Sequence, residues 1–590
     1  MTGLLQRGAR DDKGFLPRVA LVFALFAVLA VLTDISGIAA LRFPDPDDTL
    51  RLVQVRDLIA GQGWFDLHQH RVDALDGGVP MHWSRLVDIP LAAAILALRP
   101  FIGQPTAEMA ALVGVPLLTF FCAALLAMRI AWRFFGREAA TFAGLALALS
   151  VPVVSQMRPL RIDHHGWQVV LALAAVNALM AKSPRLGGWL AGLALAAWLS
   201  ISIEGLPLAA AIVGLVAWRW LRRAADKTWL VATTQGLAFG SAALFLATRG
   251  LSDLAVHCDA IAPIHLAVFA WGAGALSALA ALAPRTRLFT LAGFGAVGAG
   301  ALTLLLSVAP QCAGGGFAEL DPLVRQYWYL GVGEGLPVWQ HPLGEALQVV
   351  VPPAIGIGAA IRLARGASGK AREWWTDYAL LLSAALLIAV AVTRAGAVAG
   401  ALAAVPLGWQ LAQWLGAARK LRTLPKRALA LAAIALALLP AMPVTLFSLA
   451  VPARGANGPV STKASTCRIP QAAATLRRLP KGEILAPLDI GPRLVYETPH
   501  TVIATGHHRG SAAMHVAIEA FLGSPDAAHA LVLKRGTAYV ALCPDLIEPA
   551  TYAEAAPSGF AAQLIAGKAP PWLEPVAMPG TVGLRVWKVK

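Results

Sequence analysis

The sequence predicts an α-helical polytopic membrane protein that carries a C-terminal α/β domain. Of its 590 residues, 57% are hydrophobic and only 14% are charged. The mean hydropathy is +0.64, and long apolar runs recur over most of the chain. A soluble enzyme of this length is less apolar. Repeated bilayer crossings explain the composition, because about 20 apolar residues span the hydrocarbon core.

The first crossing is expected in the apolar run 16–41. It follows the basic residues Arg7, Arg10, Lys13 and Arg18. The run is longer than the hydrophobic part of a cleaved signal peptide, so we interpret it as a retained helix. Basic residues before it predict a cytoplasmic N-terminus.

Counting the remaining apolar runs predicts about thirteen spans. With this count, every cluster of basic residues falls on the cytoplasmic side, as positively charged loops do. The net charge of +16 therefore reflects membrane topology, and a nucleic-acid partner is not expected. Four outward segments are richer in polar residues: 42–90, 156–165, 251–265 and 310–345.

The composition changes after the last predicted span. We expect a transmembrane domain at 1–451, a linker rich in Pro, Gly and Ala at 452–460, and a domain at 461–590 in which short apolar strands alternate with helices. An odd number of spans places this last domain outside. The sequence thus predicts a multi-pass protein of the inner (plasma) membrane with a periplasmic C-terminal domain.

Cysteine usage agrees with this topology. Cys122 lies within a predicted span, whereas Cys258, Cys312, Cys467 and Cys543 all map to the outer side. Pairing of 258 with 312 and of 467 with 543 is one option in an oxidising compartment. Four free, buried thiols are the equal alternative, since sequence does not establish connectivity.

The segment PDPDDTLRLVQVR, 44–56, crowds charged residues at the end of the first predicted span. Its acids are Asp45, Asp47 and Asp48, and Arg51 follows. The simplest interpretation is an acidic helix start in which Asp48 caps the segment 49–60. Charges at a membrane edge are costly unless they have a function or access to water, so a functional role is the alternative.

Two later outward segments carry further candidates. In MRPLRIDHHGWQ, Asp163, His164 and His165 form a carboxylate and imidazole set that suits a metal ion, although histidines that merely cap helices are the simpler reading. Behind three consecutive glycines, Glu319 and Asp321 stand in a segment able to close over a substrate. An ordinary surface loop is the alternative there.

Arg394 stands at the outer end of a predicted span with no acidic residue nearby in the sequence. Such an arginine either reaches to lipid headgroups or binds a phosphate at the bilayer edge. Glu204, at the outer end of another span, is expected to be solvated. A divalent cation, Mn²⁺ or Mg²⁺, held by Asp45, Asp163, His165 and Glu319 would suit transfer from a lipid-linked phosphate donor.

The pattern resembles the catalytic subunits of oligosaccharyltransferases, within the GT-C superfamily of lipid-dependent glycosyltransferases. The matching residues are Asp45-Pro46 with Arg51, the Asp163-His164-His165 element, Glu319, and Arg394 with Pro406 downstream. The resemblance implies thirteen spans, a cytoplasmic N-terminus and an exported C-terminal domain. It implies that Asp45 is the catalytic carboxylate that polarises the acceptor, that Asp163 and His165 bind the metal with Glu319, and that Arg394 contacts the donor phosphates.

The chain departs from that family on the acceptor side. The family's motif of two tryptophans followed by Asp-Tyr-Gly is reduced to 487–491, where only Asp489 and Gly491 remain, and Gln168 stands where Glu is common. N-linked protein glycosylation therefore does not follow. We expect an anionic acceptor or donor headgroup to be contacted instead by Arg493, His507, His508 and Arg509. A structural role for these residues is the alternative.

The leading hypothesis is a metal-dependent glycosyltransferase that moves a sugar or oligosaccharide from a polyprenyl-phosphate or diphosphate carrier. Its acceptor is a protein, a lipid or a polysaccharide. Membrane lipid surrounds the enzyme itself. The competing class is a transporter or flippase of a lipid-linked glycan, for which internal repeats and charges near the bilayer midplane are expected. A scaffold or sensor, the third class, would not need the acidic loops.

Overall fold

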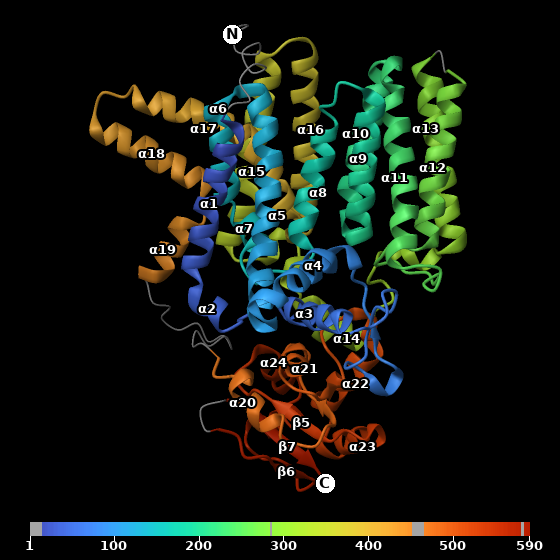
Figure 1. Cartoon of the computed structure of the whole chain (residues 1–590), viewed down its shortest axis with the longest axis vertical. Coiled ribbons are helices and arrows are strands. Elements are labelled where there is room, and N and C mark those ends of the chain that lie inside the picture. The colour runs from blue at the N-terminus through green and yellow to red at the C-terminus, as the bar shows by residue number, and fades with distance from the viewer. Residues whose placement is uncertain (1–13, 284–285, 451–464, 580–582) are drawn as a thin grey trace. The chain divides into compact units, whose positions relative to one another are not determined.

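The computed structural model describes residues 14–283, 286–450, 465–579 and 583–590 (Figure 1). They form two compact units. Unit 1 contains the described residues of Met1–Arg42, Ser84–Gly316 and Gly333–Pro452. Unit 2 contains those of Phe43–Trp83, Phe317–Val332 and Ala453–Lys590. The linker expected at 452–460 and the basic residues Arg7, Arg10 and Lys13 lie outside the described residues.

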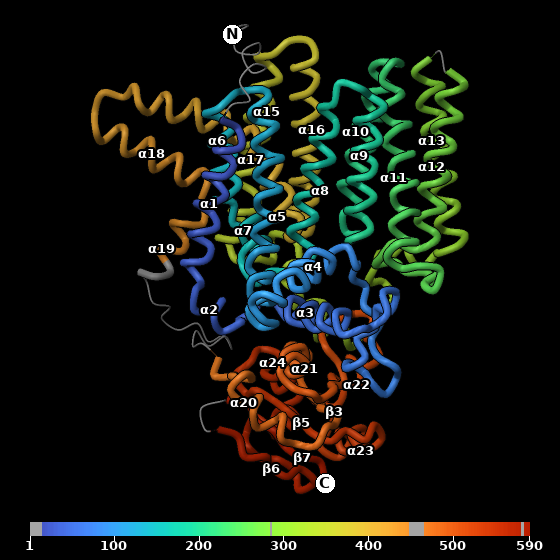
Figure 2. The backbone as a smooth tube through the Cα atoms, in the orientation of Figure 1, coloured from blue at the N-terminus to red at the C-terminus, as the bar shows by residue number. Residues whose placement is uncertain are grey.

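Unit 1 is a bundle of helices, most of which run side by side (Figures 1 and 2). They are α1 (Phe15–Thr33), α2 (Ile35–Ala39), α4 (Arg85–Ile102), α5 (Gln104–Phe135), α6 (Arg137–Leu149), α7 (Val151–Met157), α8 (His165–Ala178), α9 (Pro184–Ile201), α10 (Leu206–Arg222), α11 (Lys227–Thr248), α12 (Pro263–Ala281), α13 (Arg287–Val308), α15 (Leu343–Gly366), α16 (Gly369–Ala391), α17 (Gly396–Arg419), α18 (Leu424–Leu438) and α19 (Met442–Ala450).

The helices of unit 1 confirm the predicted α-helical polytopic membrane protein. Within the described residues, nine helices are long and apolar enough to cross a bilayer. The bent pair of α6 and α7, whose axes meet at 71°, would raise this number to ten if it forms one span. Helices α8, with 14 residues, and α18, with 15, are shorter than a full crossing. The expectation of about thirteen spans therefore stays a prediction.

Small residues let the helices of unit 1 approach closely, as is typical of membrane bundles. A Cβ on Gly192 of α9 would lie 2.2 Å from the carbonyl oxygen of Thr233 on α11. Helix α17 is the most enclosed of the candidate spans, with 83% of its apolar window buried. Helix α17 begins at Gly396, two residues after Arg394, so this enclosed helix positions the turn that carries the arginine.

Unit 2 is an α/β domain around a five-stranded sheet in the order β4-β3-β5-β7-β6. Strands β4 (Thr501–Val502), β3 (Glu483–Leu485) and β5 (Tyr539–Leu542) are parallel, while β7 (Arg585–Val589) and β6 (Leu573–Pro575) are antiparallel. This confirms the expected C-terminal α/β domain. Its helices are α20 (Ile469–Leu476), α21 (Gly491–Glu497), α22 (Ser511–Leu522), α23 (Pro525–Arg535), α24 (Ile547–Ala555) and α25 (Phe560–Ile565).

Two stretches from earlier in the chain also belong to unit 2. One contains α3 (Pro46–Ile59) and the hairpin of β1 (His68–Gln69) and β2 (Val79–Pro80). The other contains α14 (Pro322–Tyr327). Helix α3 packs against α21 (Figure 2), and Leu50 and Val53 of α3 lie in one apolar core with Ile484 of the sheet. Residues expected to form loops of the transmembrane domain thus fold with the C-terminal domain.

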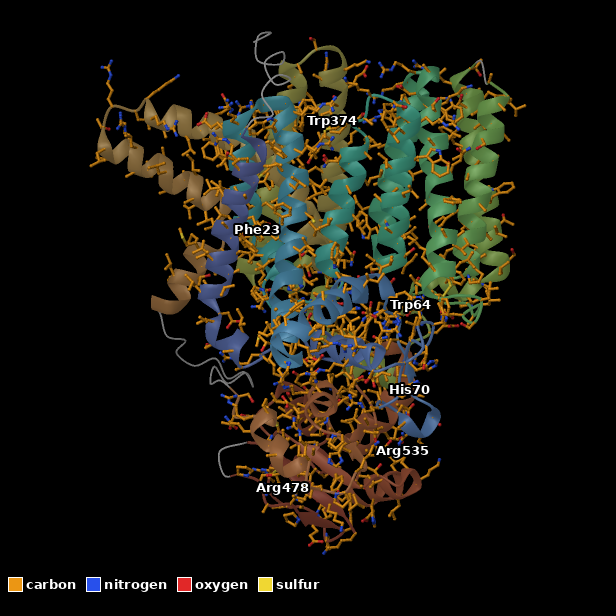
Figure 3. All side chains as sticks on the ribbon, viewed as in Figure 1. Phe23, Trp64, His70, Trp374, Arg478 and Arg535 are labelled. Carbon is orange, nitrogen blue, oxygen red and sulfur yellow. A yellow bond between two sulfur atoms is a disulfide. The ribbon has the colours of Figure 1, made fainter. Side chains whose placement is uncertain are left out.

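Backbone pairing and buried charge fasten the first of these stretches to the sheet. Val72 forms a parallel bridge with Val502, where the amide of Asp73 donates to the Val502 carbonyl at 2.9 Å. Arg535, labelled in Figure 3, donates to Asp73 Oδ1 at 2.7 Å and to Glu483 Oε2 at 3.0 Å. All three side chains are about nine-tenths buried. Removing one partner would leave a buried charge uncompensated.

Both cysteine pairs considered above form disulfides. Cys258 is bonded to Cys312 in unit 1, and Cys467 to Cys543 in unit 2. Cys122 carries no disulfide. The alternative of four free thiols is therefore wrong.

Candidate active site

The candidate site of unit 1 is built on the turn between α7 and α8. Asp163, His164 and His165 occupy this turn and are 4%, 7% and 6% exposed. The turn is packed tightly, because a Cβ on Gly166 would lie 2.9 Å from Thr119 Oγ1 and 3.0 Å from the Gln156 carbonyl. A polar tripeptide at the start of an apolar helix is thereby buried, which is costly unless its groups have partners.

The three side chains converge. Asp163 Oδ1 lies 2.6 Å from His164 Nδ1, and Asp163 Oδ2 lies 3.4 Å from His165 Nε2. One ligand atom from each residue lies within 4.8 Å of the other two. In the described part of the chain, the His164 side chain makes no capping hydrogen bond to α8. The metal-ligand interpretation therefore fits this turn better than the capping one.

The Nδ1 side of the His165 ring is contacted by Gln168, which is hydrogen-bonded in turn by Trp198. Gln168 Nε2 lies 3.3 Å from His165 Nδ1, and Trp198 Nε1 donates to Gln168 Oε1 at 3.0 Å. This arrangement leaves Nε2 of the ring facing Asp163. Gln168 stands where the resemblance implies a Glu, and its side chain contacts the imidazole of His165.

The structure places Glu334 beside this turn. Its Oε1 lies 3.6 Å from His165 Nε2, and its Oε2 lies 3.6 Å from Arg161 Nη2. The backbone around it is fixed, since Thr393 donates to the carbonyl of Glu334 through Oγ1 at 3.1 Å and to that of Leu336 through its amide at 3.1 Å. Glu334 is therefore anchored to the residue that precedes Arg394.

Glu319 was the glutamate of this segment predicted from the sequence, and Glu334 was not predicted. Glu319 belongs to unit 2 and is exposed. The signal that points to Glu334 is the pattern Gly333-Glu334-Gly335, which forms a tight 3-10 turn. A Cβ on Gly335 would lie 3.1 Å from Arg394 Nη2, so this glycine permits the close approach of the guanidinium.

Positive charge surrounds the Glu334 carboxylate. Burial opposes its ionisation, but the charges of His165, Arg394 and Arg161 outweigh burial and hold the pKa of Glu334 well below its ordinary value. Glu334 is thus an ionised carboxylate at neutral pH. An ionised acid next to an imidazole and a second carboxylate is a suitable donor set for a hard divalent cation.

Arg394 contacts two acidic residues of unit 1. It pairs with Glu204, and its Nη2 lies 3.9 Å from Glu334 Oε1. Glu204, which was expected to be solvated, is exposed, and its carboxylate is also the ion-pair partner of Arg394. The guanidinium is largely buried, with 16% of its side chain exposed.

An apolar groove separates the two helices that lead to Arg394 and Glu204. Helix α10 begins just after Glu204, and α16 ends just before Arg394. Between them lies a cavity of about 190 Å³. It is lined by Gly214, Leu215 and Trp218 of α10 and by Leu380, Leu381 and Ala384 of α16.

The acids of the first loop lie in unit 2, at the start of α3. Asp45, not Asp48, is the N-cap of this helix: its Oδ1 accepts the amide of Asp47 at 3.0 Å, and Pro46 takes the first helical position. Asp48 is fully buried in the first turn. The predicted capping role was therefore assigned to the wrong aspartate. Arg51 is also fully buried, with its guanidinium 4.3 Å above the ring of Trp83.

Asp489 lies near the same acids. Its amide and that of Leu488 donate to the carboxylate of Glu548, at 2.9 Å and 2.7 Å. Desolvation, and then the charges of Asp45 and Asp47, raise the pKa of Asp489. The first loop and the segment 487–491 thus meet within unit 2.

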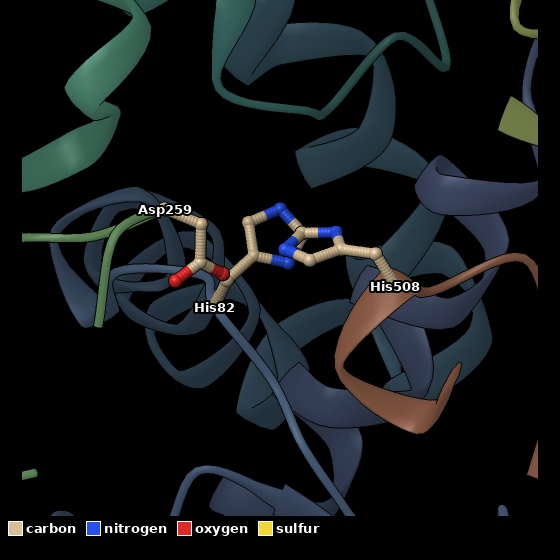
Figure 4. Close-up of side chains that lie close together, drawn as sticks. All are labelled: His82, Asp259 and His508. Atoms are coloured by element: carbon tan, nitrogen blue, oxygen red, sulfur yellow. The ribbon is translucent and has the colours of Figure 1, made fainter. Parts of the chain in front are cut away.

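The basic candidates of unit 2 have partners of their own. Arg493 pairs with Glu497 at 2.7 Å, and His507 Nε2 lies 3.2 Å from Asp47 Oδ1. The ring of His508 lies 4.6 Å from that of His82 (Figure 4). Arg509 occupies the 3-10 turn His508–Gly510 and is partly buried. A role for these residues in binding an anion stays a prediction.

Comparison with known proteins identifies the fold. No protein-family model and no curated protein matches the chain. Its structure is similar to that of the archaeal oligosaccharyltransferase AglB from Archaeoglobus fulgidus in complex with an inhibitory peptide and a dolichol-phosphate. That similarity has a TM-score of 0.64 and 14% identity, and covers 94% of this chain and 72% of the other.

A second structure of the A. fulgidus enzyme, tethered by a disulfide bond to an acceptor peptide containing the NVT sequon, is similar with a TM-score of 0.66 and 14% identity, over 95% of this chain and 73% of the other. The apo form gives a TM-score of 0.62 at 14% identity, over 96% and 73%. At this identity the similarity concerns the fold.

Proposed function

We propose that this chain, which has the fold of the archaeal oligosaccharyltransferases, is a glycosyltransferase that moves a sugar or oligosaccharide from a polyprenyl-phosphate or polyprenyl-diphosphate carrier to an acceptor. One observation carries the proposal: Asp163, His165 and Glu334 converge in unit 1, with Arg161 and Arg394 beside them. Carboxylates and an imidazole suit a divalent cation, and guanidinium groups suit the phosphate.

The donor set fits a divalent cation, Mn²⁺ or Mg²⁺. His165 Nε2 lies 3.4 Å from Asp163 Oδ2 and 3.6 Å from Glu334 Oε1. Neighbouring ligands of such a cation, bonded at about 2.1 Å, lie about 3 Å apart. Small movements of these side chains would therefore complete the site, and we assign to Glu334 the role first given to Glu319. The cation would neutralise charge on the leaving phosphate.

Arg394 and Arg161 are assigned to the donor phosphate. Their planar guanidinium groups match the geometry of phosphate oxygens. Arg394 is held by Glu204 and Glu334. A phosphate that arrives would replace Glu204 as a partner of Arg394, so Glu204 keeps the guanidinium oriented while the donor is absent.

The groove between α10 and α16 is assigned to the polyprenyl chain of the donor. Its walls are aliphatic and aromatic side chains, and both helices end next to the Arg394 and Glu204 pair. A lipid whose phosphate contacts Arg394 would run along α10 and α16 to reach this groove. Burial of its methylene and methyl groups would contribute to affinity.

Asp45 keeps the role that the resemblance implies, as the carboxylate that polarises the acceptor. Its fixed position at the start of α3 supports a precise role. The two disulfides support a periplasmic location of the Cys258 loop and of unit 2, because disulfides persist in oxidising compartments.

The proposal is tested by mass spectrometry of the glycans and envelope polymers of a deletion strain. We expect one glycan to disappear and to return with the wild-type gene but not with Asp163→Ala. The purified protein is expected to lose turnover of the lipid-linked donor in EDTA and to regain it with Mn²⁺ or Mg²⁺. An unchanged glycan profile in the deletion strain would contradict the proposal.

A further inference from the structure

The loop that carries Glu334 is fastened to the bundle by a histidine that the proposed function does not use. His341 Nε2 lies 3.0 Å from Thr393 Oγ1, and the same hydroxyl donates to the Glu334 carbonyl at 3.1 Å. On the other side of the ring, His341 Nδ1 lies 3.1 Å from Glu345 Oε2. All of these residues belong to unit 1. One hydroxyl therefore joins the imidazole to the backbone of Glu334.

The single proton of the Thr393 hydroxyl gives this row of contacts a direction. The Glu334 carbonyl only accepts, so the hydroxyl proton is used there. The oxygen of Thr393 must then accept from His341 Nε2. A carboxylate also only accepts, so Nδ1 donates to Glu345. The row is complete when both ring nitrogens carry a proton, and His341 is then the donor to Thr393.

The two contacts of the His341 ring differ in how far water reaches them. The side chain of His341 is 12% exposed, whereas that of Glu345 is 67% exposed. Water screens an ion pair with such an exposed carboxylate, so this pair adds little. The contact between His341 and Thr393 is partly buried. It is therefore the contact through which the ring acts on the loop.

Thr393 collects the segment 333–341 at its beginning, its middle and its end. Its hydroxyl donates to the carbonyl of Glu334, its amide donates to that of Leu336 at 3.1 Å, and its hydroxyl oxygen contacts His341. Between these points the segment folds in 3-10 turns. The hydrogen bonds of such turns have poorer geometry than those of an α-helix. The order of the segment thus depends on its contacts with Thr393.

We propose that His341 is a positioning residue for Glu334. By donating to Thr393, the imidazole leaves the hydroxyl proton to the Glu334 carbonyl and so holds the Glu334 carboxylate 3.6 Å from His165 Nε2. This inference rests on the proposed function, in which Glu334 binds a divalent cation. Without the ring, the hydroxyl of Thr393 is free to turn, and the Glu334 carbonyl loses a fixed donor. The cation site then loses the support of one ligand.

Binding of Mn²⁺ to the purified full-length protein tests this assignment without any turnover. The free ion is measured by EPR in the absence of a donor lipid. His341→Ala is expected to weaken Mn²⁺ binding about tenfold or more, as loss of the support of a metal ligand does. His341→Gln should keep most of the affinity, because it places an amide N–H near the position of Nε2. Gln340→Ala, at the exposed neighbour, is the matched control and should bind as the wild type does.

Variants of Thr393 test the same bond from its other side. Thr393→Val keeps the shape of the side chain and removes the hydroxyl, so it should weaken Mn²⁺ binding as much as His341→Ala does. Thr393→Ser keeps the hydroxyl and should bind almost normally. The double variant of His341→Ala and Thr393→Val should lose no more than either single variant, because both remove one bond. Additive losses would overturn the inference.

Hydrogen exchange gives a readout that needs no cation. The amides of 333–341 are expected to exchange about tenfold faster in His341→Ala and in Thr393→Val, while those of α16 are unchanged. Turnover separates support from ligation. Saturating Mn²⁺ should return the kcat of His341→Ala to near the wild-type value, because its ligands are all present, and should not do so for Glu334→Gln.

Wild-type Mn²⁺ affinity and exchange in both His341→Ala and Thr393→Val would overturn the inference. Equal losses in His341→Ala and His341→Gln would also overturn it, since the bulk of the ring and not its donor would then matter. Failure of the proposed function looks different. If the deletion strain kept its glycan profile while His341→Ala loosened the segment and weakened Mn²⁺ binding, sugar transfer would be wrong and the role of His341 would stand.

Discussion

Glu334 Oε1 lies 3.6 Å from His165 Nε2, and its other oxygen lies 3.6 Å from Arg161. A carboxylate from a loop is therefore held against a buried carboxylate and imidazole by the charges around it. In the proposed enzyme, this relationship decides whether the cation site is complete.

Loss of a ligand at this site should abolish turnover and leave the fold intact. We expect Glu334→Gln and Asp163→Ala to lower kcat about 100-fold or more, with little change in the thermal unfolding of the purified protein. Asp45→Ala should act in the same way. Glu319→Gln separates the two glutamates of this segment. A loss with Glu319→Gln and not with Glu334→Gln would return the role to Glu319.

Arg394 and Glu204 should affect donor binding with opposite signs. Arg394→Ala is expected to raise the KM for the lipid-linked donor about tenfold or more, because a contact with phosphate is lost. Glu204→Gln should lower this KM, because it removes the carboxylate that competes with phosphate for the guanidinium. Steady-state kinetics with varied donor measure both. A raised KM in Glu204→Gln would show that orientation of Arg394 matters more than competition.

Arg535 should be a major source of stability in unit 2. Arg535→Ala leaves Asp73 and Glu483 as buried, uncompensated charges, and we expect a loss of about 3 kcal/mol in the free energy of unfolding. Thermal unfolding of the full-length protein measures this as a lower midpoint for unit 2. Glu574→Gln, at an exposed residue of β6, is the control, and an unchanged midpoint in Arg535→Ala would show that the network is neutral.

Glu548 should make the stability of unit 2 depend on pH. Burial and the nearby charge of Asp489 raise the pKa of Glu548 from 4.5 to about 7. The folded state therefore keeps a proton that the unfolded state has lost, so the free energy of unfolding should fall as pH rises from about 5 to about 8. Glu548→Gln, which cannot ionise, should show a smaller fall. Parallel pH profiles for the two proteins would contradict this shift.

The fold class could be predicted because it depends on local properties. Apolar runs and the alternation of strands and helices are visible in short windows. The composition of unit 2 could not be predicted, because the bridge between Val72 and Val502 joins residues with no local signal for each other. For the same reason the sequence did not show that 43–83 and 317–332 fold with the C-terminal domain.

The residues of the candidate site also divide into those with a local signal in the sequence and those without one. Asp163 and His165 could be found because they are almost adjacent, and Arg394 because it is isolated in an apolar stretch. Glu334 was missed because its partners depend on how its loop is anchored to Thr393. The cap of α3 was assigned to Asp48 although Pro46 marks the first helical position, a local signal that identifies Asp45.

Unit 2 also sets an order for biogenesis. Residues 43–83 are synthesised long before 465–590, and most of the membrane helices are made in between. Val72, Asp73 and the apolar face of α3 therefore lack their partners until the end of the chain has been made. A chain truncated before Val502 would leave the apolar face of α3 and the backbone of Val72 without the sheet against which they pack.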